Sequence, residues 1–402
     1  MIVVVAPLGP SGAGAEENRP AEPSVSQFSA WLDVFNSGDR ERYAEFLAGS
    51  FPARPAEFPI ARLTEGEAIA GVQAMLREDA AADRFSGAVL VAKNGQALFS
   101  RAYGLADREQ GIPNTLQTRF RIGSMNKMFT AVATLQLAEA GKVELTAPLG
   151  AYLTGYPNRD AAATVTIHHL LTHTGGTGDI FGPEFKTHRQ ELRRLEDYVQ
   201  LYGDRELEFE PGSRWKYSNY GFILLGAVIE KVTGQAYYDY VNAHIYQPAN
   251  MTATGSQPEH EAVPDLSAGY TKQPGTTTWA PNTGTLPWRG TSAGGGYSTT
   301  GDLARFAQAL LGHRLLGPDS TQLLITGKVD IAPGARYAYG FADLRDTEGN
   351  GSVGHDGGAQ GMNGALWICP KSGYVVVALA NMDPPPAQRI AAWLDARLPA
   401  RG

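Results

Sequence analysis

The sequence predicts an α+β fold: one antiparallel sheet built from strands at both ends of the chain, flanked by helices, with a mostly helical subdomain inserted. Three observations predict it. Residues 85–103 read as two strands around a tight turn. Residues 364–369 and 374–380 are short apolar runs typical of strands. The residues between, about 124–310, show mostly helical apolar spacing, broken by long loops rich in glycine and proline.

The first 24 residues are expected to lie outside the sheet and the inserted helical subdomain. Residues 1–8 are apolar and are followed by small residues, as at the end of a secretory signal, although the positively charged start of such a signal is missing. Residues 9–24 are rich in Pro, Gly, Ala and Glu. We interpret residues 1–24 as a leader or signal remnant. This slightly favours a periplasmic or secreted protein over a cytoplasmic one.

The next segment, residues 25–64, is predicted to be an N-terminal helical extension. Apolar side chains recur at helical spacing over residues 26–47, and Asn36-Ser37-Gly38-Asp39 divides them into two helices. Prolines at positions 52, 55 and 59 end the pair. We expect this extension to pack against the main domain.

The main domain is predicted over residues 65–402. Residues 65–78 have the spacing of an amphipathic helix, and Asn94-Gly95 is a strong hairpin signal because both central residues of a type I′ turn need positive φ. Residues 387–398 carry an apolar stripe and form a closing helix. We expect a sheet subdomain at about 65–123 and 290–402, and a helical subdomain at about 124–289.

Composition narrows the classes of partner. The chain has 402 residues, 43% of them hydrophobic and 19% charged, which is enough apolar material for a sizeable core. Its formal charge is −7, and no block of Lys and Arg provides a footprint for nucleic acid. No apolar run approaches the ~18 residues of a membrane-spanning helix. The single cysteine, Cys369, reads as a small buried hydrophobe in a strand. We therefore expect a small-molecule substrate and no cofactor.

The first segment that carries chemistry is residues 121–130, RIGSMNKMFT. A helix is predicted to begin at Ser124 and to stop at Gly141. Ser124 and Lys127, at i and i+3, then share one face. The free N–H groups and the dipole at the start of the helix favour an alkoxide and a neutral lysine that accepts the proton of the serine. Taken alone, a helix cap beside a surface lysine explains the pair better.

The second segment is residues 215–221, WKYSNYG, which follow a Pro-Gly turn and precede an apolar helix. Tyr217 and Asn219 are expected on a loop at the helix start. A phenol beside a lysine ammonium shifts toward phenolate and shuttles protons. The Asn219 amide can orient Lys127 or hold a substrate carbonyl. Taken alone, a capped helix with a buried aromatic loop explains this segment better.

The third segment is residues 354–361, GHDGGAQG, which we interpret as a glycine-rich turn just before the strand at 364–369. The glycines indicate that another group approaches the backbone closely. The N–H after Gly357, together with that of Ser124, would form an oxyanion hole worth ~3–4 kcal/mol per donor. His355 would contact a substrate carboxylate or Tyr217. Taken alone, a hairpin without chemistry explains this segment better.

In this order the three segments resemble the Ser-x-x-Lys, Tyr-x-Asn and Lys/His-x-Gly motifs of the serine β-lactamase and penicillin-binding protein superfamily. The closer resemblance is to its class C-like branch, with family VIII carboxylesterases, D-aminopeptidases and DD-peptidase-like hydrolases. Residues 170–176 (LLTHTGG) and 294–304 (GGGYSTTGDLA) also resemble that branch. The resemblance covers roughly residues 65–400 and implies a β-lactamase/transpeptidase-like fold.

The resemblance implies roles for individual residues. Ser124 matches the nucleophile, Lys127 the lysine that helps to activate it, and Tyr217 the general base and acid. Asn219 matches the amide that binds substrate and Lys127.

The remaining roles fall on the third motif. His355 and Gly357 match substrate-binding positions, and the N–H of Gly358 joins that of Ser124 in the oxyanion hole. His355 stands where a β-lactamase carries lysine. Because histidine is mostly neutral at pH 7, this favours neutral esters over β-lactams.

The predicted function is therefore a serine hydrolase that cleaves carboxylic esters through an acyl-enzyme on Ser124. The alternatives are a DD-peptidase, D-aminopeptidase or weak β-lactamase with the same site, and a catalytically silent binding or sensor protein. The substrate is expected to be a small ester or amide. The sequence does not predict an oligomeric state.

Three other features carry less weight. Gly290-Thr291-Ser292-Ala293-Gly294 fits the Gly-x-Ser-x-Gly nucleophile elbow, but it lacks the strand before and the helix after that this elbow needs. Four histidines are expected to be structural rather than to bind a metal, since no suitable acidic or cysteine ligands accompany them: His168, His169, His173 and His188. Proximity to the motifs makes Asp179, Phe181 and Tyr220 candidate pocket-wall residues.

Overall fold

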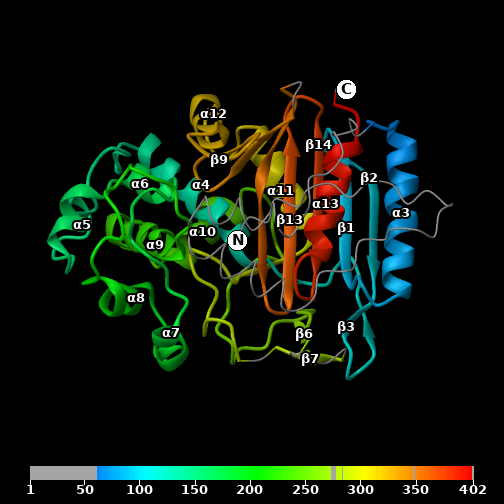
Figure 1. The fold of residues 1–402 in the computed structure, drawn as a ribbon, viewed down its shortest axis with the longest axis horizontal. Coiled ribbons are helices and arrows are strands. Elements are labelled where there is room, and N and C mark those ends of the chain that lie inside the picture. Colours follow the sequence, from blue (N-terminus) through cyan, green and yellow to red (C-terminus); the bar gives the residue numbers. More distant parts are fainter. Residues whose placement is uncertain (1–60, 273–277, 283, 347–348, 401–402) are drawn as a thin grey trace, which may run out of the picture.

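The computed structural model describes residues 61–272, 278–282, 284–346 and 349–400. The predicted leader, residues 1–24, and nearly all of the predicted extension, residues 25–64, lie outside the described residues. Within them the predicted α+β fold is confirmed, because helices surround one large antiparallel sheet (Figure 1).

The large sheet joins strands from the two ends of the chain, as predicted. Its strands pair antiparallel throughout. In spatial order they are β2 (Gln96–Tyr103), β1 (Gly87–Lys93), β14 (Tyr374–Ala380), β13 (Met362–Cys369), β12 (Gly351–Ala359), β11 (Ala342–Arg345), β10 (Ala335–Tyr337) and β9 (Val329–Ala332). Central β1, β13 and β14 are almost entirely buried, which explains their continuous apolar sequences.

The predicted hairpin lies at one edge of this sheet. Asn94 and Gly95 link β1 to β2 with φ of 48° and 85°, as the turn type requires. β1 also pairs with β14, so that Val91 lies opposite Val376 although the two residues are far apart in the sequence.

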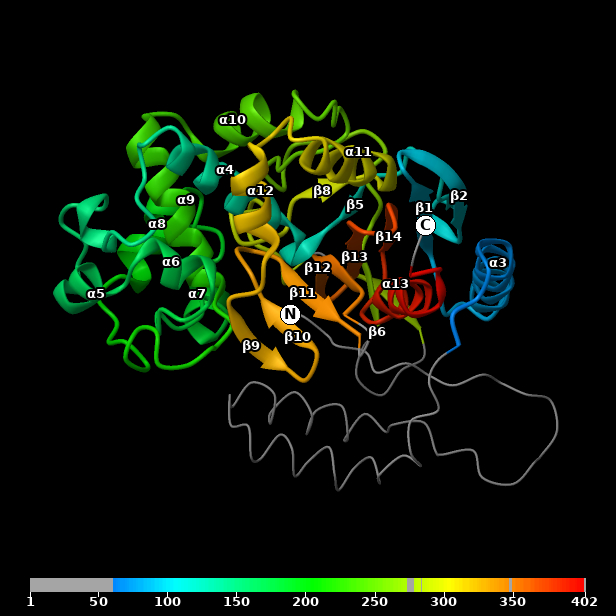
Figure 2. The same ribbon diagram turned by 90° about the horizontal axis from the view of Figure 1, so that it is seen from above.

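Helices cover both faces of the sheet (Figure 2). α3 (Glu65–Ala81) and α13 (Pro386–Arg397) pack on one face, where Val72, Leu394 and Val376 share a buried cluster. α3 begins with a capping box between Thr64 and Glu67. α11 (Thr300–Leu311) packs on the other face. The predicted helices at 65–78 and 387–398 are confirmed with small shifts at their ends.

The middle of the chain forms the helical part, which lies beside the sheet in Figure 1. Its helices are α4 (Asn126–Glu139), α5 (Arg159–Thr164), α6 (Ile167–Leu171), α7 (Pro183–His188), α8 (Leu195–Tyr202), α9 (Asn219–Thr233) and α10 (Tyr237–Val241). α12 (Pro318–Ile325) follows α11. α9 is buried on almost every side and ends at Gly234, whose φ of 69° suits a left-handed cap.

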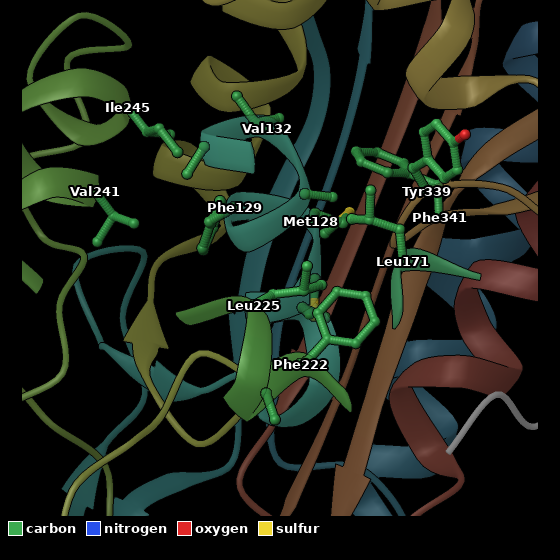
Figure 3. Close-up of a cluster of buried hydrophobic side chains, with 14 of the residues drawn as sticks. Met128, Phe129, Val132, Leu171, Phe222, Leu225, Val241, Ile245, Tyr339 and Phe341 are labelled. Atoms are coloured by element: carbon green, nitrogen blue, oxygen red, sulfur yellow. The ribbon is translucent and has the colours of Figure 1, made fainter. Parts of the chain in front are cut away.

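A large apolar core fixes α4 in place (Figure 3). Phe129 of α4 meets the rings of Tyr246 and Phe306 edge-on, at 5.3 Å and 4.9 Å between ring centroids. Phe222 of α9 lies in the same cluster. The helix that carries the first motif is therefore held rigidly by its neighbours.

The structure differs from the sequence prediction in its shorter strands. β9, β10 and β11 were not predicted, since they are only three or four residues long and partly polar. Three small pairs were also missed: β3 (Leu105–Asp107) with β4 (Ile112–Pro113), β5 (Phe120–Arg121) with β8 (Tyr297–Ser298), and β6 (Tyr270–Lys272) with β7 (Trp279–Pro281). Among the helices of the described ranges, none combines the length and the apolar character needed to cross a bilayer.

Candidate active site

Ser124 lies in a single 3₁₀ turn, Gly123–Met125, immediately before α4. The predicted helix is confirmed with its start shifted by two residues, since the regular α-helix begins at Asn126, directly after this turn. The serine is 8% exposed. It still lies at the amino end of a well-packed helix, where free N–H groups and the helix dipole favour negative charge.

Lys127 projects from the first turn of α4 and is fully buried. Its Nζ donates to Asn219 Oδ1 at 2.7 Å and to the carbonyl oxygen of Ala293 at 2.6 Å. The same nitrogen lies 4.6 Å from the centre of the Tyr217 ring. The three motif residues Lys127, Tyr217 and Asn219 are thus brought together from two parts of the chain.

The burial of Lys127 changes its chemistry. Burial lowers the pKa of its ammonium from 10.5 to about 7, and the negative charge of Asp179 partly opposes that shift. At neutral pH a large fraction of Lys127 is therefore an uncharged amine. An uncharged amine one helical turn from Ser124 can accept a proton from a hydroxyl group.

Tyr217 lies in the loop that precedes α9, as predicted. Burial raises the pKa of its phenol well above 10, and a side-chain hydrogen bond with Ser124 works against the rise. The predicted shift of Tyr217 toward phenolate is therefore wrong. The hydroxyl keeps its proton at neutral pH and is equipped to donate one.

Asn219 is the first residue of α9, and Ser218 caps the helix by accepting from Gly221 N at 2.9 Å. The Asn219 amide faces two ways, with Oδ1 toward Lys127 and Nδ2 toward the carboxylate of Asp179. The predicted orientation of Lys127 by Asn219 is present in this geometry. A contact between Asn219 and a substrate stays a prediction.

The third motif lies inside strand β12 rather than in a turn, which corrects the sequence interpretation. A Cβ at Gly357 would lie 2.0 Å from the carbonyl oxygen of Ile122 and 3.0 Å from the nitrogen of Ser124. A Cβ at Gly123 would lie 3.0 Å from the nitrogen of Gly358. The glycines are present because two backbone segments pass each other with no room for a side chain. This close approach brings the backbone at Ser124 next to that at Gly358.

His355 is buried in β12, and both of its ring nitrogens are engaged within the protein. Nε2 lies 3.1 Å from the hydroxyl of Tyr337, and Nδ1 meets the carbonyl oxygen of Asp356. Burial lowers the pKa of His355 well below 6.5, so its ring is neutral. Direct contact between His355 and a substrate stays a prediction, since the ring would have to give up one of these partners.

A hydrogen-bond chain continues from His355 into the helical part. Tyr337 also lies 3.0 Å from Nε2 of His173, whose Nδ1 accepts from the backbone N–H of Ser218 at 3.1 Å. The Ser218 donor requires that His173 carry its proton on Nε2 and donate to Tyr337. Tyr337 then donates to His355, which donates to the Asp356 carbonyl. The N–H of Ser218 at one end and the carbonyl of Asp356 at the other thus set the direction of every hydrogen bond in this uncharged chain. The chain lies next to Tyr217, whose ring centre is 4.3 Å from that of His173.

The rival nucleophile, Ser292, is fully buried against α9, where a Cβ on Gly226 would lie 2.4 Å from its Oγ. Its loop instead provides acceptors: the carbonyl of Ser292 accepts from Thr130 at 2.7 Å, and that of Ala293 accepts from Lys127. Sequence reasoning missed the Ala293 carbonyl, because any residue type can provide a backbone acceptor.

The three candidate pocket-wall residues have different surroundings in the structure. Asp179 contacts Asn219, whereas Phe181 is 55% exposed and packs edge-on against Phe185. Tyr220 is buried in the helical core and shares a hydrogen bond of 3.0 Å with Tyr156. The interpretation of Tyr220 as pocket wall is therefore wrong, because its side chain points into the core.

The four histidines that could be mistaken for a cluster have separate partners. His168 bonds to Tyr339 at 2.8 Å, and His169 caps its own helix at Thr166. His188 pairs with Glu191. In the part of the chain that the structure describes, no group of three or more His, Cys, Asp or Glu side chains could hold a metal ion.

Known proteins share the sequence pattern of this chain. The sequence pattern of the family described as Beta-lactamase matches residues 72–400, close to the range of the resemblance found by motif. Two relatives are each 32% identical to this chain. The putative penicillin-binding protein PbpX of Bacillus subtilis (strain 168) aligns over 73% of this chain and 70% of its own length. Esterase EstB of Burkholderia gladioli aligns over 74% of this chain and 86% of its own length.

A solved structure shows the same fold. The crystal structure of a penicillin binding protein from Bacillus halodurans superimposes with a TM-score of 0.74 at 34% sequence identity. The superposition covers 80% of this chain and 98% of that protein. The predicted β-lactamase/transpeptidase-like fold is confirmed by this likeness.

Proposed function

Since this chain belongs to the Beta-lactamase family and is a hydrolase of that fold, we propose that it cleaves carboxylic esters through a covalent acyl-enzyme on Ser124. One observation carries the proposal: a lysine that is fully buried, which favours its uncharged form, lies one helical turn from a serine. A serine hydroxyl becomes a strong nucleophile only when a base takes its proton, and an uncharged Lys127 is such a base.

In the proposed acylation, Ser124 Oγ attacks the ester carbonyl carbon and its proton passes to the neutral amine of Lys127. The resulting tetrahedral oxyanion is held by the backbone N–H groups of Ser124 and Gly358, worth ~3–4 kcal/mol per donor. The intermediate collapses when Tyr217 gives its phenol proton to the departing alkoxide. Tyr217 then recovers a proton from the ammonium of Lys127, which restores both groups. Water repeats the sequence in place of Ser124 to release the acid.

The preference for esters rests on His355. Burial keeps its ring neutral, so this position offers no permanent charge to the carboxylate of a β-lactam or a peptide. The 32% identity to esterase EstB supports the same substrate class. The alternative is a DD-peptidase, D-aminopeptidase or weak β-lactamase with the same residues, which the equal identity to PbpX favours.

A substrate panel separates these functions. We expect p-nitrophenyl butyrate to be turned over much faster than nitrocefin or a D-alanine anilide. Faster turnover of nitrocefin or of the anilide would favour the alternative. A fluorophosphonate probe followed by intact mass measurement tests a silent binding protein, which would form no adduct on Ser124 although folded.

Activity is expected to fall in acid with an inflection near pH 7, because Lys127 must be uncharged to accept the serine proton. Below that point kcat/KM should drop about tenfold per pH unit. No alkaline loss from Tyr217 is expected up to pH 10, since its pKa lies well above that value. The measurement is kcat/KM for p-nitrophenyl butyrate, followed at the isosbestic wavelength of the product.

The matched control for this profile is Lys142→Met, which removes an exposed lysine just beyond α4 and should leave the inflection unchanged. An inflection near pH 4 to 5 would instead assign control to a carboxylate and contradict the role of Lys127.

Gly357→Ala is expected to reduce ester turnover by about 100-fold or more, because the new Cβ must push β12 away from the turn that holds Ser124. Steady-state kinetics and thermal unfolding should be measured together, and kcat should fall in protein that remains folded. Gly66→Ala is the control, since a Cβ at that helix position meets nothing within 4 Å. Full activity in Gly357→Ala would show that the spacing between the two segments does not matter.

A further inference from the structure

Asp179 lies at the far side of the Asn219 amide from Lys127. Both of its carboxylate oxygens accept from Asn219 Nδ2, at 3.1 Å and 3.0 Å, and Oδ2 also lies 3.3 Å from the backbone nitrogen of Asn219. The two residues are 40 positions apart in the sequence. Asp179, Asn219 and Lys127 therefore form a continuous hydrogen-bonded row that ends at the proposed base.

The chemistry of a carboxylate sets the orientation of the amide. An ionised carboxylate only accepts hydrogen bonds, so the NH₂ end of Asn219 must face Asp179. The oxygen of the amide is then left to face the Nζ of Lys127, at 2.7 Å. With a neutral partner in place of Asp179, the amide could turn over and present NH₂ to the lysine.

The backbone that carries Asp179 is itself held firmly. Arg205 donates to the carbonyl oxygen of Asp179 at 2.8 Å, and Tyr202 donates to that of Ile180 at 3.0 Å. The backbone N–H of Ile180 also donates to Asp179 Oδ1 at 2.6 Å. The carboxylate is therefore fixed in a position from which it can orient another group.

Asp179 supplies a nearby negative charge to Lys127. In the part of the chain that the structure describes, Tyr217, His173 and His355 also face this lysine. All three are uncharged at neutral pH, because burial raises the pKa of the Tyr217 phenol and lowers the pKa of each imidazole. Asp179 is thus the facing group whose charge opposes the effect of burial on Lys127.

We propose that Asp179 is a positioning residue for the proposed esterase site, which holds the Asn219 amide in its productive orientation and places a compensating negative charge near Lys127. The inference rests on the proposed function of that site. It assigns to Asp179 no contact with the substrate.

Asp179→Asn tests the inference, because it removes the charge and keeps the shape of the side chain. We expect kcat for p-nitrophenyl butyrate to fall by about 10- to 100-fold with little change in KM, since a misplaced catalytic group costs rate. We also expect the acid inflection of kcat/KM to move to lower pH, because loss of the negative charge favours the uncharged lysine. A purely structural defect would lower the amount of active enzyme without moving the inflection.

Two further variants keep the test decisive. Asp197→Asn removes a carboxylate that caps the start of α8 and has no contact with Asn219, so it should leave the inflection in place. The exchange Asp179→Asn with Asn219→Asp returns one charge directly beside Lys127 and should move the inflection to higher pH. Opposite shifts in the single and the exchanged variant would support the inference even if one of them is less stable.

An unchanged inflection in folded Asp179→Asn would overturn the inference. So would an equal shift in Asp197→Asn. The rate of fluorophosphonate labelling at Ser124, measured against pH, gives the same inflection without any ester substrate. If the wild type is labelled but cleaves no ester, the proposed substrate fails while the role of Asp179 is still tested.

Discussion

Ser124→Ala is expected to lower ester turnover by about 10⁴- to 10⁶-fold, because the variant has no hydroxyl with which to form the acyl-enzyme. The remaining rate would come from binding and from the oxyanion hole acting on water. Folding should change little, since the side chain is small and lies in a turn whose backbone is held by its neighbours. Intact mass measurement after the fluorophosphonate probe should show an adduct on the wild type and none on the variant.

The matched control is Ser292→Ala. Ser292 belongs to the segment that imitates a nucleophile elbow, but its side chain is buried against Gly226 of α9. This variant should keep most of the activity and accept the probe. If Ser292→Ala lost activity in a folded state while Ser124→Ala kept it, the assignment of the nucleophile would be wrong.

Tyr217→Phe is expected to lower kcat by about 10²- to 10⁴-fold, the range of a lost general acid. The change removes one oxygen atom and leaves the ring that packs against His173. Burial keeps this phenol protonated, so what is lost is the proton for the departing alkoxide. Stopped-flow measurements with p-nitrophenyl butyrate should show slower deacylation, in which the departing alkoxide is that of Ser124, and the acid inflection set by Lys127 should persist.

Tyr220→Phe serves as the control for that experiment. It also removes a buried phenol oxygen close to the same motif, but that oxygen bonds to Tyr156 in the helical core. Some stability should be lost and the rate per folded molecule should be kept. If kcat of Tyr217→Phe were within tenfold of the wild-type value, Lys127 alone would both accept the proton of Ser124 and protonate the leaving group.

Features that depend on local chemistry were predicted correctly from the sequence. The hairpin at Asn94-Gly95 follows from the positive φ that both residues adopt easily. The closing helix α13 follows from its apolar stripe. The chain order of the three motifs also predicted the family, which the match over residues 72–400 confirms.

Features that depend on tertiary contacts were missed. Glycines in residues 354–358 suggested a turn, yet they belong to β12. At Gly357 the carbonyl oxygen of Ile122 and the nitrogen of Ser124 leave no room for a side chain. Tyr337, the partner of His355, lies on β10, which has only three residues, too few for its alternation of buried and exposed side chains to predict a strand.

The electrostatic state of the site was predicted in part. The neutral lysine expected at the helix start agrees with the lowered pKa of Lys127, whereas the predicted phenolate is wrong, because burial raises the pKa of Tyr217 and keeps it protonated. How deeply a side chain is buried depends on what packs over it, and motif spacing does not encode that. Asp179 was noted for its proximity, but its hydrogen bonds to Asn219 required the structure.

The neutral chain of His173, Tyr337 and His355 makes the fold sensitive to acid. Burial keeps the pKa of both imidazoles well below 6.5 in the folded protein, whereas the unfolded chain takes up these protons below about pH 6.5. Each ring therefore removes up to about 1.4 kcal/mol of unfolding free energy for every pH unit below that point, until the folded state also titrates. Lys127 likewise lowers the unfolding free energy as the pH falls from about 10.5 to 7, because the unfolded chain protonates this lysine first. The two imidazoles and Lys127 thus make the folded state more stable as the pH rises toward 10, the range in which the base is also unprotonated. Above about pH 10 the trend reverses, because the buried phenols of Tyr217 and Tyr337 keep protons that the unfolded chain gives up.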